Sequence, residues 1–248
     1  MQYVWPHPKR PLVYVASSNG GPGRTGDRHH LSAFGVATNS GALTAHGKPQ
    51  ALPSRPIHFC LDRLGAYALT AYNNPSMMTV HRLHEDGTIG AAVPQPAGLD
   101  AGIYAHQVLV TPSNRAAILV ARGNDAAGDK PEDPGALKLL GFADGVLTNR
   151  ASIAPGGGYG FGPRHLDFHP SKPFVFVSIE RQNQLQVFGL GPDDALTPEP
   201  LFVASTLADP AHVKPRQLAG GIHVPPNGRL VSVSNRSHPL ADFNGQMP

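Results

Sequence analysis

The chain has one cysteine, Cys60, among its 248 residues, so it cannot form an intrachain disulfide framework. Secreted domains are often held together by disulfides, whereas a reducing cytosol keeps thiols free. The N-terminal segment also lacks the basic and apolar stretches of a secretion signal. We therefore expect a cytoplasmic protein.

Long apolar runs and basic clusters are also missing. No hydrophobic run approaches the roughly 18 residues that a membrane-spanning helix requires, so we expect no membrane partner. Charged residues make up 15% of the chain and the net charge is +3, without the clustered Lys and Arg that bind nucleic acid. We expect a small, anionic molecule as the partner, and the sequence carries no signal for an oligomeric state.

Motifs of common catalytic and cofactor sites are absent as well. The chain has no Gly-x-Ser-x-Gly elbow and no Walker motif. A Gly-rich block at 156–162 resembles a phosphate loop, but it lacks the dinucleotide spacing and no helical pattern follows it. Thirteen histidines include the pair His29-His30, yet none forms a paired-histidine helix or has a cysteine partner. We expect neither a cofactor nor a metal.

A strand pattern recurs five times along the chain. Each copy has a short apolar strand, a turn, and a second apolar strand that ends on a polar residue. The clearest copy is residues 162–180. The residue that precedes each second strand marks the register, and we call it the anchor: Pro8, Arg63, Pro112, Pro170 and Pro226. Strand repeats at this spacing indicate a β-propeller.

Four copies continue with a third strand and a hairpin turn, such as Asp86-Gly87 and Asp144-Gly145. Each copy therefore predicts one four-stranded antiparallel blade, and the fold class is all-β. About four and a half blades are present, with units starting near residues 3, 58, 106, 165 and 221. Open blade edges would be exposed, so we interpret 1–248 as a single, incomplete propeller domain and a fragment of a larger ring.

The registers place polar residues at one mouth of the central channel. Ten residues after the anchors stand Ser18, Asn73, Arg122, Glu180 and Arg236, and each follows an apolar strand. Cross-strand neighbours at the same end include His106, Arg164, His58 and His165. We expect His106 beside Arg122, and Arg164 beside Glu180. Structural alternatives exist for each: an ion pair for Arg164, packed rings for His58 and His165, strand caps for Asn73, and loop anchoring for Arg122 and Arg236.

The sequence resembles the lactonase family of seven-bladed propellers, which includes 6-phosphogluconolactonases and carboxymuconate cyclases. The matching segments are 54–58, 104–106, Gly162-Pro163-Arg164-His165 with 168–170, and 222–224 leading to 233–236. The resemblance covers essentially the whole chain, although members of the family have seven blades. It implies that His106, Arg164, Glu180 and Arg236 lie in a catalytic cleft.

The resemblance implies a hydrolase that opens a sugar-acid lactone, such as 6-phosphogluconolactone in the pentose phosphate pathway. Either Glu180 or His106 would activate water, while Arg164 and Arg236 would hold the oxyanion and the substrate charge. A carboxylate gripped by Arg164 is a poorer base, which favours His106. His58, Asn73, Arg122 and His165 would contact substrate. A muconate-type cycloisomerase and a non-catalytic binding propeller are the alternatives.

Overall fold

The computed structural model describes residues 1–21, 24, 26–213 and 217–236. Within this part, it contains four four-stranded antiparallel sheets and one two-stranded sheet. The expected all-β fold with about four and a half blades is thus confirmed. Residues 237–248 of the proposed domain lie outside the described residues, and the interpretation of 1–248 as one domain remains a prediction.

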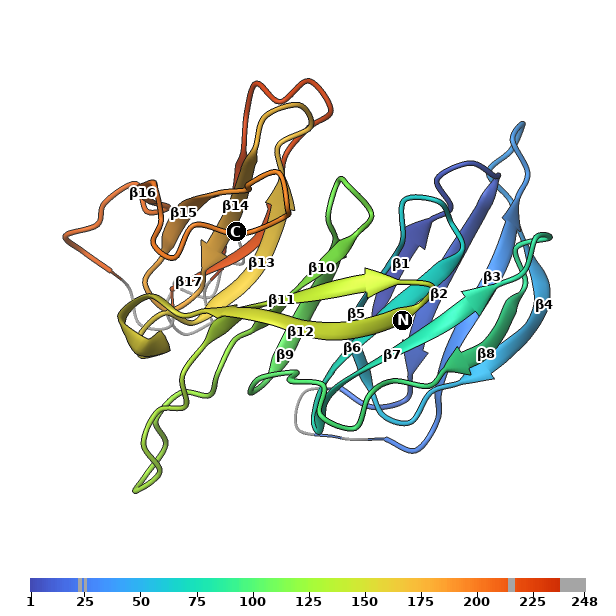
Figure 1. Ribbon diagram of the computed structural model, residues 1–248, viewed down its shortest axis with the longest axis horizontal. Coiled ribbons are helices and arrows are strands. Elements are labelled where there is room, and N and C mark those ends of the chain that lie inside the picture. Colours follow the sequence, from blue (N-terminus) through green and yellow to red (C-terminus); the bar gives the residue numbers. More distant parts are fainter. Residues whose placement is uncertain (22–23, 25, 214–216, 237–248) are drawn as a thin grey trace, which may run out of the picture. The chain divides into compact units, whose positions relative to one another are not determined.

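The strands of each sheet follow one another along the chain, and Figure 1 shows them as successive antiparallel arrows. Their bounds are β1 Tyr3–Pro6, β2 Leu12–Ser18, β3 His29–Val36, β4 Leu43–Ala51, β5 Pro56–Leu61, β6 Tyr67–Asn73, β7 Ser76–Leu83, β8 Ile89–Val93, β9 Ala105–Val110, β10 Ala116–Ala121, β11 Ala136–Ala143, β12 Val146–Ile153, β13 Pro163–Phe168, β14 Phe174–Ile179, β15 Gln184–Gly189, β16 Phe202–Ser205, β17 Leu218–His223 and β18 Ser232–Arg236. One 3₁₀ turn, η1, spans Pro155–Gly158.

The predicted second and third strands agree with the structure in most sheets. In the last sheet, however, β18 begins at Ser232, and the apolar residue Leu230 that follows the anchor Pro226 lies outside the strand. The Leu230 side chain is exposed, and the ladder begins where Ser232 pairs with His223. The first three residues of the Gly-rich block at 156–162 lie in η1, in which Gly156 and Gly157 have left-handed rather than helical backbone angles.

The chain divides into two compact units by its internal contacts. The first comprises Met1–Ala121 with Lys138–Ser152, and the second comprises Arg122–Leu137 with Ile153 onward. The first unit has a core that includes Tyr14, Leu31, Phe59 and Tyr72. In the second unit, the buried side chains include Phe161, Leu166, Val175, Val177 and Phe188. Burial of these apolar side chains holds each sheet to its neighbour within a unit.

Contacts between the first turns of successive sheets recur, and we call them turn joints. The His7 ring packs on Gly65 so closely that a Cβ added at Gly65 would lie 2.5 Å from His7 Nε2. At Gly228 an added Cβ would lie 2.8 Å from His169 Nε2. Both glycines have positive φ, a backbone conformation that glycine adopts without strain. The turn therefore favours glycine, and the missing side chain also leaves room for the histidine ring.

A third turn joint uses hydrogen bonds instead of ring packing. Asn114 Nδ2 donates to Asp62 Oδ2 at 3.0 Å, and the Arg63 amide donates to Asn114 Oδ1 at 2.7 Å. The three joints occupy equivalent places in the repeat, two with ring packing and one with hydrogen bonds. Within each unit, successive sheets are therefore fastened at their turns as well as by their buried faces.

Candidate functional site

Glu180 is the centre of a charged cluster in the second unit. It follows β14 directly, and its amide donates to the Gly162 carbonyl at 2.9 Å while its carbonyl accepts from the Ala219 amide. These backbone bonds fix its position between the ends of β13 and β17. The side chain is only 6% exposed. A buried carboxylate is costly unless it is paired, so the surroundings of Glu180 must supply cations.

Three arginines from different elements supply them. Arg164 Nε lies 3.0 Å from Glu180 Oε1, and Arg236 Nη2 contacts the same oxygen. Arg122 Nε donates to Glu180 Oε2. Both carboxylate oxygens are therefore engaged by guanidinium groups. The expected pairing of Arg164 with Glu180 is confirmed, and Arg122 and Arg236 are brought to the same carboxylate.

Arg164 reaches Glu180 from a β-bulge. Pro163 pairs with Ile179 and His165 pairs with Ser178, so Arg164 is the extra residue of β13. A bulge bends the strand locally and turns a side chain away from its regular direction. Bulges occur at the same point of the repeat in three other sheets: at Ile57 in β5, at His106 in β9, and between Ala219 and Ile222 in β17.

Arg122 is fully engaged by protein groups. Its Nη1 donates to the Gly123 carbonyl at 3.1 Å, its Nη2 donates to Asp125 Oδ2 at 2.8 Å, and its Nε donates to Glu180. Burial alone would lower the pKa of Arg122, but the Glu180 and Asp125 carboxylates raise it above its ordinary value. All three nitrogens of Arg122 thus serve to hold Glu180 and the loop that begins at Gly123.

A second ion network, which sequence reasoning missed, adjoins the first. Arg181 follows Glu180 in the chain, its Nε lies 2.6 Å from Asp125 Oδ1, and its Nη1 contacts Glu132 Oε1. The Gly160 amide donates to the same Glu132 oxygen at 2.6 Å. Asp125 and Glu132 belong to the long loop that links β10 to β11. In the sequence this loop is recognisable only as rich in Gly and Asp. The one signal for the second network was the charged residue Arg181, which directly follows the predicted site residue Glu180.

His165 follows Arg164 in β13 and is partly buried. Its amide donates to Ser178 Oγ at 3.2 Å, and its Nε2 lies 3.5 Å from Arg164 Nη1. Arginine can only donate, so Nε2 is the acceptor and Nδ1 carries the proton. Burial, reinforced by the charges of Arg164 and Arg236, lowers the pKa of His165 to about 3. The ring is therefore neutral near pH 7.

The remaining predicted site residues belong to the first unit. The His58 ring is fully buried, with its centroid 4.0 Å from that of Tyr3. His106 is buried in β9 with its ring 6.2 Å from that of Tyr104, and Asn73 ends β6 opposite Ser76. Packing of His58 against an aromatic ring favours a structural role, while the roles of Asn73 and His106 remain predictions. The structure thus gathers five of the eight predicted residues, Arg122, Arg164, His165, Glu180 and Arg236, around one carboxylate.

The cluster can hold and orient an anion. Arg236 is the most exposed of the three arginines, with 40% of its side chain accessible against 18% for Arg164. Arg236 Nε is buried and has no hydrogen-bond partner among the described residues. That nitrogen is out of reach of a ligand, so the accessible part of the Arg236 side chain is the part suited to a carboxylate or phosphate oxygen. No group of three potential metal ligands occurs among His, Cys, Asp and Glu in the described part of the chain.

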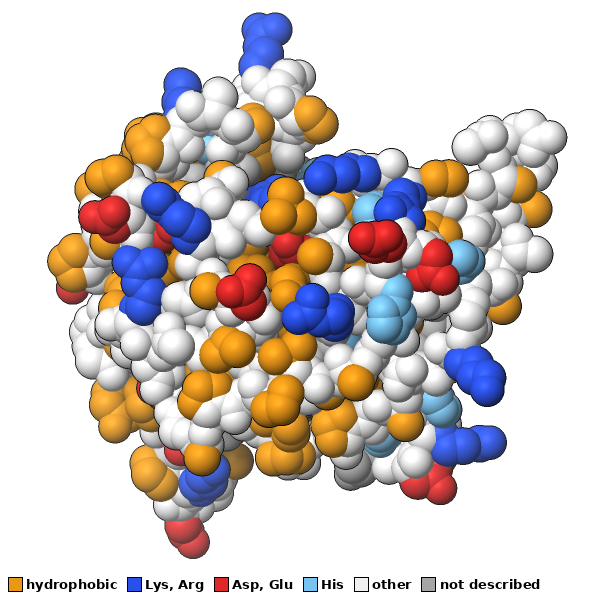
Figure 2. All heavy atoms as spheres, turned by 45° about the vertical axis from the view of Figure 1, so that its right-hand side comes forward, with side chains coloured by type: hydrophobic (Ala, Val, Ile, Leu, Met, Phe, Trp, Pro, Cys, Tyr) orange, Lys and Arg blue, Asp and Glu red, His pale blue; other side chains and the backbone are white. Residues whose placement is uncertain are grey.

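The rest of the described surface offers two further observations. On the face drawn in Figure 2, blue Lys and Arg side chains are interspersed with red Asp and Glu side chains. None of the helices in residues 1–21, 24, 26–213 and 217–236 is long and apolar enough to cross a membrane.

Comparisons with known proteins agree with this architecture. The chain is 28% identical over 217 residues to 6-phosphogluconolactonase of Bacillus subtilis, covering 84% of this chain and 57% of that protein. It is 30% identical over 200 residues to 6-phosphogluconolactonase of Pectobacterium carotovorum, covering 81% of this chain and 55% of that protein. The chain therefore spans somewhat more than half the length of these relatives.

Solved structures show the same fold. The periplasmic gluconolactonase of Pseudomonas aeruginosa matches with a TM-score of 0.69 at 19% identity, over 99% of this chain and 69% of that chain. A protein from Lactobacillus plantarum matches with a TM-score of 0.70 at 20% identity, over 95% and 64% of the two chains. The family described as lactonase, 7-bladed β-propeller, matches residues 1–243. With its four-stranded sheets and its bulged inner strands, the chain belongs to the lactonase family of seven-bladed β-propellers.

Proposed function

We propose that this protein hydrolyses the lactone of a sugar acid, with 6-phosphogluconolactone as the leading substrate. The observation that carries the proposal is the buried Glu180 held by Arg122, Arg164 and Arg236. The relatives named 6-phosphogluconolactonase, each matched along a little over half of its length, support this substrate class.

In the reaction, a water oxygen attacks the lactone carbonyl carbon and the carbonyl oxygen becomes an oxyanion. Arg164 and Arg236 are the candidates to donate hydrogen bonds to that oxyanion or to the charged groups of the substrate. Collapse breaks the bond between the acyl carbon and the ring oxygen, and the proton lost by water reaches the departing oxygen. The product is an open-chain hydroxy acid whose new carboxylate is also attracted to the arginines.

Glu180 is better suited to orienting the arginines than to accepting a proton. Both of its oxygens already accept hydrogen bonds or ion pairs from guanidinium groups. Protonation would have to displace at least one of them. His106 in β9 therefore stays the preferred candidate for the base, and His165 is a poor one because its pKa is about 3.

The test is a lactone-consumption assay on the purified chain with 6-phosphogluconolactone, corrected for spontaneous hydrolysis. Arg164→Ala and Arg236→Ala should each lower kcat/KM by about 10²- to 10³-fold, the usual loss when an oxyanion donor is removed. His106→Ala should lower kcat. Arg229→Ala is the matched control, because Arg229 is exposed in the same unit and its side chain belongs to neither ion network. This variant should keep the rate of the unmodified chain.

Three results would contradict the proposal. Unchanged rates in the Arg164 and Arg236 variants would remove these residues from the site. Turnover of a muconate without turnover of any lactone would reassign the chain as a cycloisomerase. Saturable binding of 6-phosphogluconate without any turnover would make it a binding protein.

A further inference from the structure

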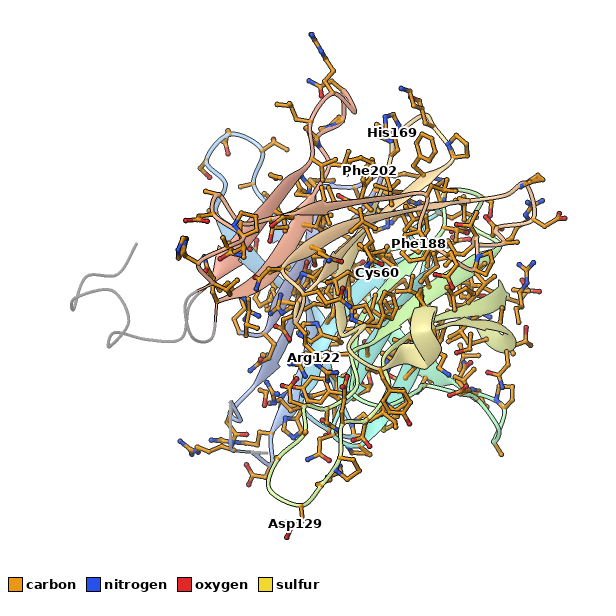
Figure 3. The ribbon with its side chains drawn as sticks, turned by 90° about the vertical axis from the view of Figure 1, so that its left-hand side faces the viewer. Cys60, Arg122, Asp129, His169, Phe188 and Phe202 are labelled. Atoms are coloured by element: carbon orange, nitrogen blue, oxygen red, sulfur yellow. The ribbon has the colours of Figure 1, made fainter. Side chains whose placement is uncertain are left out.

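The loop from β10 to β11 is tied to the Glu180 cluster by a bridging carboxylate. Asp125 Oδ2 accepts from Arg122 at 2.8 Å, and Asp125 Oδ1 lies 2.6 Å from Arg181 Nε. One carboxylate therefore joins an arginine that grips Glu180 to the arginine that follows Glu180 in the chain. Figure 3 shows Arg122 at the base of this loop and Asp129 at its far tip.

Arg181 holds the loop at two points. Besides Asp125 near the start of the loop, it contacts Glu132 near the end, and Glu132 also accepts from the Gly160 amide. The two branches of the loop are thus fixed to the backbone beside Glu180. Because Asp125 is fixed in this way, the direction of the Arg122 guanidinium is fixed as well.

We propose that Asp125 and Arg181 are positioning residues for the lactonase reaction, and that they act by holding Arg122 on Glu180. This inference rests on the proposed function. Arg122 has partners on all three nitrogens, so it acts as a support that keeps Glu180 aligned with Arg164 and Arg236. We call Asp125, Arg181 and Glu132 the clamp. Together, the Glu180 cluster and the clamp contain four arginines and three carboxylates, which leaves one net positive charge.

The charge balance gives the two clamp variants distinguishable signatures. Asp125→Asn removes a negative charge, so KM for the anionic lactone should fall. Arg181→Gln removes a positive charge, so KM should rise. Both variants loosen Arg122, so kcat should fall in both by about 10- to 100-fold, as expected when a supporting contact is lost. The KM effects should shrink as salt is added, because exposed charges are screened.

Two further variants complete the kinetic test. Asp125→Glu keeps the charge and should recover most of kcat. Asp129→Asn removes the same charge from the exposed tip of the same loop and should leave both constants unchanged. Wild-type kcat in both clamp variants, or KM shifts of the same sign, would overturn the inference. So would equal effects of Asp125→Asn and Asp129→Asn, because they would indicate a general charge effect of the loop.

A measurement without turnover separates this inference from the proposed function. The Arg122 Nε proton, assigned with Arg122→Lys, should be protected from exchange with water in the unmodified chain and should exchange at least tenfold faster in Asp125→Asn. If the unmodified chain fails to hydrolyse lactones, the proposed function and the catalytic part of the inference fail together. The proton exchange then still decides whether Asp125 holds Arg122, and unchanged protection would reject the clamp itself.

Discussion

Acidification should destabilise this protein through His165, and the size of the effect can be worked out. The folded pKa of this ring is about 3, whereas its ordinary value is 6.5. Because the folded pKa is depressed, the stabilisation from His165 is fully present above pH 6.5 and is lost as the pH falls towards 3. As the pH falls from 8 to 5, the His165 ring binds a proton in the unfolded chain but stays neutral in the folded chain. This difference lowers the unfolding free energy by about 2 kcal/mol. Any folded pKa below about 4 gives the same figure.

The assay is urea unfolding at several values between pH 5 and pH 8, on the unmodified chain and on His165→Gln. Other buried histidines, including His7 and His81, also have lowered pKa values because of burial, so the unmodified chain should lose more than His165 alone predicts. The difference between the two proteins isolates His165. Glutamine can still accept from Arg164 but does not titrate, so its stability should depend less on pH by about 2 kcal/mol.

Two outcomes would refute the reasoning. The glutamine variant could lose as much stability between pH 8 and pH 5 as the unmodified chain. Alternatively, nuclear magnetic resonance could show the His165 ring titrating near 6.5 in the folded protein. Either result would mean that the ring is not desolvated beside Arg164 and Arg236.

Three substitutions extend these expectations to other parts of the fold, with urea unfolding as the common measurement. Glu180→Gln should lower the unfolding free energy by about 3–5 kcal/mol, because three arginines would lose their buried counter-ion, and an unchanged midpoint would contradict the pairing. Tyr14→Phe should cost about 1 kcal/mol, because the buried hydroxyl donates to the Gly87 carbonyl at 2.7 Å; full stability of the variant would argue against this bond. Gly228→Ala should lower the unfolding free energy by about 1–3 kcal/mol, because φ is +64° and the new Cβ would meet His169. A decrease below about 0.5 kcal/mol would show that the His169 ring can move aside to make room for the methyl group.

The sequence was sufficient to predict the sheets and the central ion pair. Anchors such as Pro170 mark the turn between two strands, and strand alternation and hairpin turns then allow few ways to pair those strands. The pairing predicted in this way correctly placed Arg164 beside Glu180. It could not reveal the bulge at Arg164, because the pattern of apolar residues is the same with or without one extra residue at the strand end. The bulge, rather than simple cross-strand pairing, puts this side chain on the carboxylate.

The partners of the loop between β10 and β11 were beyond sequence reasoning for a different reason. Asp125 and Glu132 lie in a segment without periodicity, where composition says which residues are polar but not which ones meet. The strand position of His58 left both a substrate contact and a packed ring open, and the ring is fully buried against Tyr3, which favours the packed ring. Both cases depend on the path of the backbone through space.

The turn joints have a consequence for cooperativity. Because each joint links only successive sheets, the stability of a unit should follow a sum of nearest-neighbour terms, as in other repeat proteins. Within the described residues, the sheet of β17 and β18 has two strands where the other sheets have four, and it packs on β13 and β14 with one joint, formed by His169 and Gly228. It should therefore open locally before the other sheets, and its amides should exchange first with solvent deuterium. Since Arg236 ends this sheet, the opening would release one of the three cations from Glu180 and empty the proposed site before the protein unfolds.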